Sequence, residues 1–206
     1  MRHFLLLILL TTCTMTLFAQ DDNLSEYTRV IGGFGGPVVK YTRVYGQGAI
    51  MFGARGGWVI NHSLIIGGAI YGIVSEVNAP TVVPPADTIT PAGPMSLQLS
   101  CFGLESEYVF HPDTWIHYGV YGFIGGGSIR YVRRLNPSGN RDTRVDDSDL
   151  ALVFEPGANI EVNLNPWVRL MTGVSYRIVS GVSQIGLTNS DLRGFAVSLT
   201  LKLGNF

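Results

Sequence analysis

Residues 150–164 constrain the fold of this chain more than any other stretch. In this run, apolar residues alternate strictly with polar or small ones. Alternation with a period of two places the two sets on opposite faces of a β-strand. A globular strand has about five or six residues, and a strand tilted across a bilayer needs roughly nine to eleven. The run therefore predicts a strand with one face toward lipid and one toward a barrel interior. Its even positions, none of them polar, are Leu150, Leu152, Phe154, Pro156, Ala158, Ile160, Val162 and Leu164.

The composition also fits a chain that spans a membrane with strands. Charged residues are 14% of the sequence, against roughly 25% in soluble domains. After the first residues, however, no stretch approaches the about 18 consecutive apolar residues of a spanning helix. Closed barrels are the other structure that satisfies every backbone polar group in lipid. The net charge of −1 gives no indication of a nucleic-acid partner.

The N-terminus has the features of a secretory signal peptide. Arg2 precedes an apolar run, and Ala19 stands before a polar start. This order predicts cleavage after Ala19, with residues 1–19 as the signal peptide and residues 20–206 as a single barrel domain. Cys13 would leave with the signal peptide and Cys101 would remain alone, which excludes a disulfide framework and a cysteine metal site.

Eight strand-like segments follow in the mature chain, and short turns mostly alternate with longer connections, although the first connection, around residues 44–46, is short. Short turns lie at residues 61–62, 111–113 and 165–166, and longer loops lie at 78–95, 134–149 and 180–192. This sorting is typical of outer-membrane barrels with short periplasmic turns and longer outer loops. The sequence therefore predicts an all-β fold, an eight-stranded antiparallel transmembrane β-barrel. The segments are 29–43, 47–60, 63–76, 96–110, 114–133, 150–164, 167–179 and 193–203.

Aromatic residues cluster near the short turns. Trp58, Tyr108, Trp115 and Trp167 all lie within a few residues of one. Amphipathic rings of this kind form girdles at membrane interfaces, so these four residues are the predicted periplasmic girdle. An outer girdle is predicted from Tyr41, Tyr45 and Tyr131 near the opposite strand ends.

The signal peptide, the eight segments with sorted loops, the alternating last segment and the terminal Phe206 together resemble small eight-stranded outer-membrane barrels of the OmpA/OmpX type. The resemblance covers nearly all of the mature chain but includes no diagnostic motif. It implies a place in the outer membrane of a Gram-negative bacterium, in contact with outer-membrane lipid and lipopolysaccharide. Phe206 resembles the assembly signal that the barrel-insertion machinery reads, although it is out of phase with the alternation of residues 195–203.

A second resemblance concerns two glycine-rich stretches, residues 33–37 and 56–62. They are similar to stretches of small bacterial barrel proteins of unassigned function. This likeness supplies no activity.

Eight charged residues fall on the small or polar faces of the predicted strands, which places them in the lumen. They are Arg55, Glu105, Glu107, Glu155, Glu161, Arg169, Arg177 and Lys202. An eight-stranded barrel is just wide enough for side chains to fill, and paired charges avoid the cost of burying isolated ones. We interpret the set as a packed network of ion pairs. The alternative is a narrow pore or ligand site in which Arg169 and Arg177 meet an anion.

The histidines do not suggest an enzyme. Barrels that modify outer-leaflet lipid need a serine and a histidine near the outer rim. His62, His111 and His117 lie in or beside the short turns, away from the serines of the longer loops. We interpret them as turn or interface residues. The alternative is a serine–histidine pair near the short turns, for which Ser63 is the candidate serine. No catalytic, cofactor-binding or metal-binding residues are predicted, and no cofactor.

The sequence therefore favours a non-enzymatic outer-membrane barrel with a structural or surface-interaction role, through loops 79–95 and 134–149. A small-solute transport barrel is the alternative, and a lipid-modifying enzyme comes third. The rival fold is a soluble lipocalin-like barrel, with Leu152, Phe154, Leu199 and Leu201 facing inward. The alternation does not assign the sides of segments 29–43 and 63–76. Pro156 predicts a bulge or local break.

Overall fold

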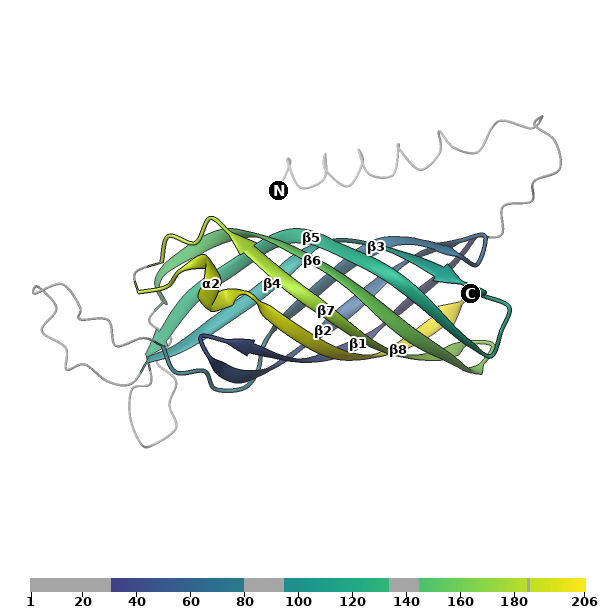
Figure 1. The fold of residues 1–206 in the computed structure, drawn as a ribbon, viewed down its shortest axis with the longest axis horizontal. Helices are drawn as coiled ribbons and strands as arrows, with labels where there is room; N and C mark the ends of the chain where they lie inside the picture. Colours follow the sequence, from purple (N-terminus) through teal and green to yellow (C-terminus); the bar gives the residue numbers. More distant parts are fainter. Residues whose placement is uncertain (1–30, 80–94, 134–144, 185) are drawn as a thin grey trace, which may run out of the picture.

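The computed structural model describes residues 31–79, 95–133, 145–184 and 186–206. The predicted signal peptide and most of loops 79–95 and 134–149 lie outside these residues. Eight antiparallel strands pair in sequence order, and β8 pairs with β1 to close a barrel (Figure 1). The strands are β1 (Ile31–Val44), β2 (Gln47–Ile60), β3 (Leu64–Ile73), β4 (Met95–Phe110), β5 (Ile116–Arg133), β6 (Val145–Asn165), β7 (Val168–Ser180) and β8 (Gly194–Asn205). A short helix, α2 (Asn189–Leu192), lies in the β7–β8 connection.

The predicted fold class is confirmed, and most strand bounds agree within two residues. β2 has the predicted bounds. β6 begins at Val145, five residues before the alternating run, because pairing with β5 resumes beyond an irregularity between Ile129 and Tyr131. β3 ends at Ile73, since the amides of Val74 and Ser75 both donate to the carbonyl of Ile50.

The outward face of the strands is apolar, whereas the inward face carries charged, polar and small residues together with apolar clusters that pack inside the barrel. On β6, Leu152 and Phe154 are exposed while Val153 and Glu155 are fully buried, and β8 repeats this pattern. The lipocalin-like alternative is therefore wrong, because it needs Leu152, Phe154 and Leu199 inside, and all three are exposed. The structure also assigns the two strands that the alternation left open: Lys40 on β1 and Tyr71 on β3 point inward.

Pro156 interrupts the sheet without shifting it. The β6–β7 pairing stops at Phe154↔Ile178 and resumes in the same register at Gly157↔Ser175. The predicted local break is confirmed. The register shift between β6 and β7 lies elsewhere, between Asn163 and Asn165.

The tight turns use left-handed backbone conformations. Tyr45 and Gly46 join β1 to β2 with φ of 49° and 68°, and Asn61 and His62 stand between β2 and β3 with φ of 50° and 57°. Two successive positive φ angles give a turn whose twist matches the flanking strands. His111, in the β4–β5 turn, also has a positive φ of 52°.

In the part of the chain that the structure describes, no helix combines the length and apolarity needed to cross a membrane.

Candidate functional site

The barrel interior collects the charged residues. All eight predicted lumen residues are buried inside the barrel, although they come from five different strands. The structure adds two that the sequence analysis did not place there, Lys40 on β1 and His117 on β5. The interior is therefore a layer of ionisable side chains, which we call the ionic layer. It consists of Lys40, Arg55, Glu105, Glu107, His117, Glu155, Glu161, Arg169, Arg177 and Lys202.

Glu107 stands at the centre of the ionic layer. Its carboxylate accepts hydrogen bonds from Arg55 Nη2 at 2.8 Å, from Asn159 Nδ2 at 2.8 Å and from Lys202 Nζ at 3.0 Å. Arg55 also donates to Glu105, and Lys202 donates to Glu161 at 2.5 Å. One acid thus links groups from β2, β4, β6 and β8.

Glu155 forms a second centre. Its carboxylate accepts from Lys40 Nζ at 2.5 Å, from Ser175 Oγ at 2.6 Å and from Tyr71 Oη at 2.9 Å. Lys40 Nζ also lies 3.8 Å from the centre of the Tyr71 ring, a cation–π contact. All three donors share one fully buried carboxylate. We interpret the arrangement as a buried ion pair with two supporting hydroxyl groups.

His117 belongs to the ionic layer, and its interpretation as a turn or interface residue is wrong. Its ring is buried, and Nε2 lies 3.1 Å from Glu161 Oε1. Arg169 Nη1 donates to the same oxygen at 3.2 Å. The guanidinium of Arg169 also stacks 4.0 Å from the ring centre of Phe206.

Arg177 differs from the other basic residues of the layer. It is fully buried, yet among the described residues its hydrogen-bond partners are neutral. Nε donates to the carbonyl of Leu192 at 2.8 Å, and Nη2 donates to the carbonyl of Arg43 at 3.2 Å and to Thr42 Oγ1 at 3.3 Å. Arg177 thus holds the β7–β8 connection against β1 and does not face an open channel.

Apolar side chains close the interior on both sides of the ionic layer. Toward the short turns, Phe34, Val59, Ile65 and Val109 form a cluster against which Phe206 packs. Toward the longer connections a larger cluster includes Met51, Leu99, Phe123 and Val153 from the strands, and Leu187 and Leu192 from the β7–β8 connection. Figure 1 shows α2 at this mouth of the barrel.

Phe206, the candidate assembly signal, turns toward the barrel interior. Its ring stacks on the buried ring of Phe34, with centroids 6.1 Å apart. The inward position follows from its phase, since Phe206 shares the parity of the buried Lys202 and Thr200.

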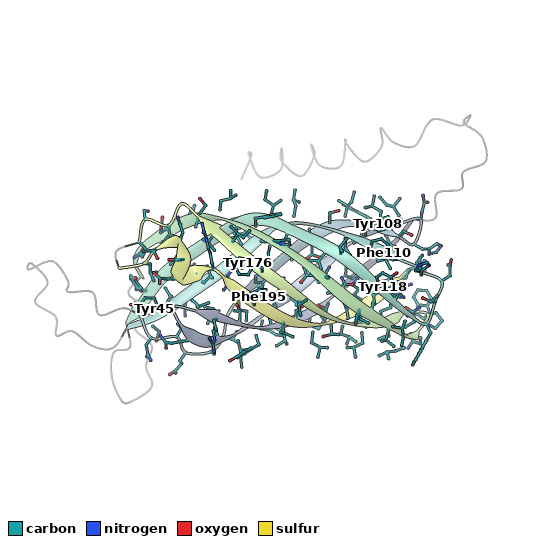
Figure 2. The ribbon with its side chains drawn as sticks, viewed as in Figure 1. Tyr45, Tyr108, Phe110, Tyr118, Tyr176 and Phe195 are labelled. Atoms are coloured by element: carbon teal, nitrogen blue, oxygen red, sulfur yellow. The ribbon has the colours of Figure 1, made fainter. Side chains whose placement is uncertain are left out.

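The predicted periplasmic girdle residues Trp58, Tyr108, Trp115 and Trp167 are all exposed beside the short turns. Phe110 and Tyr118 stack near Tyr108 at the same end (Figure 2). The predicted outer girdle is wrong for two of its three members. Tyr131 is buried in the larger apolar cluster and Tyr45 packs against it, whereas Tyr41 is exposed.

The β7–β8 connection is fixed at a second point by Asp149. Its carboxylate accepts from the Ser183 amide at 2.6 Å, the Ser183 hydroxyl at 2.8 Å and the Gln184 amide at 3.0 Å. Asp149 lies beyond Leu150, where the exposed apolar residues of β6 begin. Burial alone would raise the pKa of Asp149, but these hydrogen bonds outweigh it and hold the pKa below its ordinary value.

The described residues contain no arrangement for covalent catalysis or metal binding. Within them, no hydrogen bond joins His62, His111 or His117 to a serine, and Ser63 donates only its backbone amide, to Ile60. No group of three histidine, cysteine, aspartate or glutamate side chains among them could hold a metal ion.

Comparisons with known proteins identify a fold. No protein-family model matches the chain, and no curated protein matches it. The N-terminal β-barrel domain of Pseudomonas aeruginosa OprF is 10% identical, with a TM-score of 0.50 over 83% of this chain and 96% of that one. Neisserial surface protein A is 15% identical with a TM-score of 0.47, over 84% and 96%. Ail, the attachment invasion locus protein of Yersinia pestis, is 10% identical with a TM-score of 0.48, over 84% and 97%.

Identities this low show the fold alone, and the two scores below 0.5 carry no further weight. The OprF match agrees with the strand order and the closed β1–β8 pairing. The chain therefore has the closed, eight-stranded antiparallel fold of small outer-membrane barrels.

Proposed function

We propose that this chain is a non-enzymatic, integral protein of the outer membrane. The barrel would serve as a rigid anchor, and its structural or surface-interaction role would lie in the connections at one end. The exposed apolar faces of the strands support a lipid environment, since a soluble barrel would have to solvate them. The sorted connections support an orientation with the short turns in the periplasm.

The observation that carries this proposal is the filled interior. Two apolar clusters enclose the ionic layer, and each acid within it accepts at least one charged donor. Water or a solute would have to displace these contacts to pass. A conducting function is therefore disfavoured, and the specific contacts of the protein fall to its surface.

The partners follow from this placement. Outer-membrane lipid and lipopolysaccharide would surround the strands, and the barrel-insertion machinery would assemble them. A surface partner would meet loops 79–95 and 134–149, because the strand ends that flank them lie opposite the short turns.

The test is single-channel conductance of the refolded residues 20–206 in planar bilayers. Insertion is established first, by protection of the strands from added protease in vesicles of the same lipid. We expect no steady openings, because the interior is packed. Reproducible openings of one size from the inserted protein would contradict the proposal and make transport the leading function.

A variant supplies the matched control. Removing residues 182–191 deletes most of the connection that covers the wider apolar mouth but leaves all eight strands. If the barrel stays closed, the ionic layer alone blocks conduction. If it opens only in this variant, the connection is the seal, and the intact protein is still non-conducting.

A further inference from the structure

The backbone ladder of the seam between β1 and β8 stops short of the outer end of the barrel, and the stretch beyond it, where side-chain contacts replace backbone pairs, is called the separated part of the seam. Its ladder runs from Gly33↔Asn205 to Thr42↔Ala196 and goes no further. Beyond this point the Tyr45 amide donates to the carbonyl of Asp191 at 2.6 Å, which joins the two sides again across the β7–β8 connection. From inside, Arg177 fills the separated part of the seam.

A groove of about 570 Å³ lies over the separated part of the seam. We call it the seam groove. Its volume is within the range of small-ligand sites, about 300–1,000 Å³. It is lined by Tyr41, Thr42, Arg43, Gly46, Ser190, Asp191, Arg193, Gly194, Phe195 and Val197.

The part of the seam groove nearer the middle of the barrel is apolar and faces outward. Phe195 is 77% exposed, Tyr41 58% and Val197 53%. Tyr176 packs edge-on against Phe195 with ring centroids 4.9 Å apart, and Figure 2 shows the two rings together on the outside of the barrel. In the proposed orientation these side chains face the outer leaflet of the membrane.

The part nearer the outer end carries two arginines. Arg193 is fixed in place, because Nε and Nη2 both donate to the carbonyl of Val179, at 3.1 and 3.0 Å, which leaves Nη1 available. Arg43 is exposed, and its side chain makes no hydrogen bond or ion pair with the described residues. Asp191 is the acid of the groove, and its carboxylate already accepts from the Thr188 amide and hydroxyl, at 2.8 and 2.7 Å.

We propose that the seam groove binds the phosphate-bearing headgroup of a lipid from the surrounding leaflet. Guanidinium groups pair with phosphate oxygens through directed, charge-assisted hydrogen bonds. Arg43 and Arg193 would meet the phosphate, and the acyl chains would lie along Tyr41, Phe195 and Val197. The inference rests on the proposed membrane location but not on the absence of conduction.

Native mass spectrometry of the refolded barrel in detergent micelles tests the site, with bisphosphorylated lipid A as the probe. We expect one lipid A to stay bound to the wild type. Loss of a charge-assisted contact costs roughly tenfold in affinity, so Arg43→Gln and Arg193→Gln should each weaken binding by about that factor. Phe195→Ala should weaken it less, because only part of the chain contact is lost.

Arg130→Gln is the matched control. Arg130 lies on β5 near the same end of the barrel and does not line the seam groove. Equal loss of lipid A in this variant would overturn the proposal, because net charge alone would then explain binding. Diacylglycerol, which has acyl chains but no phosphate, retained as well as lipid A, or lipid A displaced by an equal concentration of inorganic phosphate, would also overturn it. If the chain does not insert into bilayers at all, the proposed function fails first, and that outcome is distinguishable from these.

Discussion

At the scale of single residues, Glu107 connects two buried cations of the ionic layer. It is 1% exposed and contacts Arg55, Lys202 and Asn159. Loss of its charge would leave Arg55 and Lys202 with one buried acid each, Glu105 and Glu161. The stability of the interior therefore depends more on keeping every charge paired than on any single bond.

We predict that Glu107→Gln lowers the free energy of unfolding by about 3–5 kcal/mol, the usual cost of breaking a buried ion pair from one side. Urea unfolding in micelles measures it. The control is Asp113→Asn, an exposed turn residue, for which we expect a change within about 0.5 kcal/mol. If Glu107→Gln also changed the free energy of unfolding by no more than this, water would reach the ionic layer. That result would contradict a packed interior.

At the scale of elements, the β7–β8 connection is held to the barrel from two directions. Arg177 holds it from the interior through the carbonyl of Leu192, and Asp149 holds it from the β6 side through Ser183 and Gln184. The attachment through Asp149 depends on a carboxylate that lies outside the apolar strand faces, whereas the attachment through Arg177 depends on a buried guanidinium. Loss of the Asp149 attachment should therefore leave the Arg177 attachment in place.

We predict that acidification releases the Asp149 attachment alone. The pKa of Asp149 is lowered in the folded protein, so the stabilisation is present above the ordinary aspartate pKa and is lost as the pH falls through the lowered value. The amide NMR signals of Ser183 and Gln184 should shift together in one step below the ordinary aspartate pKa of about 3.9.

Asp149→Asn should abolish that step, whereas Asp113→Asn should leave it unchanged. A step that survives in Asp149→Asn would assign the titration to another acid and contradict the attachment.

How much the sequence could predict differs between elements. Alternation on β2, β4, β6, β7 and β8 predicts the inward faces that carry eight of the charged residues, and the structure buries all eight. Lys40 was missed because glycines and Pro37 blur the two faces of β1, so no side could be assigned. His117 was missed because its partner, Glu161, lies on the neighbouring strand. Which residues face each other across two strands depends on the register of pairing, and spacing along a single strand does not reveal it.

At the scale of the whole molecule, three tryptophans mark a single level of the barrel. Trp58 lies two residues before the end of β2, and Trp115 and Trp167 lie in the β4–β5 and β6–β7 turns, yet all three are exposed beside the short turns. Indole rings prefer the headgroup region of a bilayer. This end of the barrel should therefore sit at one membrane interface, with the apolar strand faces extending from it into the hydrocarbon.

Each tryptophan can be examined alone in a variant whose other two tryptophans are replaced by phenylalanine. We predict that its fluorescence is quenched more by lipids brominated near the headgroup than by lipids brominated near the methyl end of the acyl chain. The three depth profiles should coincide. A profile centred on the bilayer middle, or three different depths, would show that these residues do not form a girdle.

The closing seam also bears on how the molecule is made. β1 pairs with β8, so the first strand synthesised has to wait for the last one before its edge is covered. During that interval the nascent sheet has two bare edges, which are templates for pairing with other chains. Such a distant contact also makes closure slow. On the proposed route to the outer membrane, we expect the chain to need an escort that shields these edges until residues 196–205 have paired with β1.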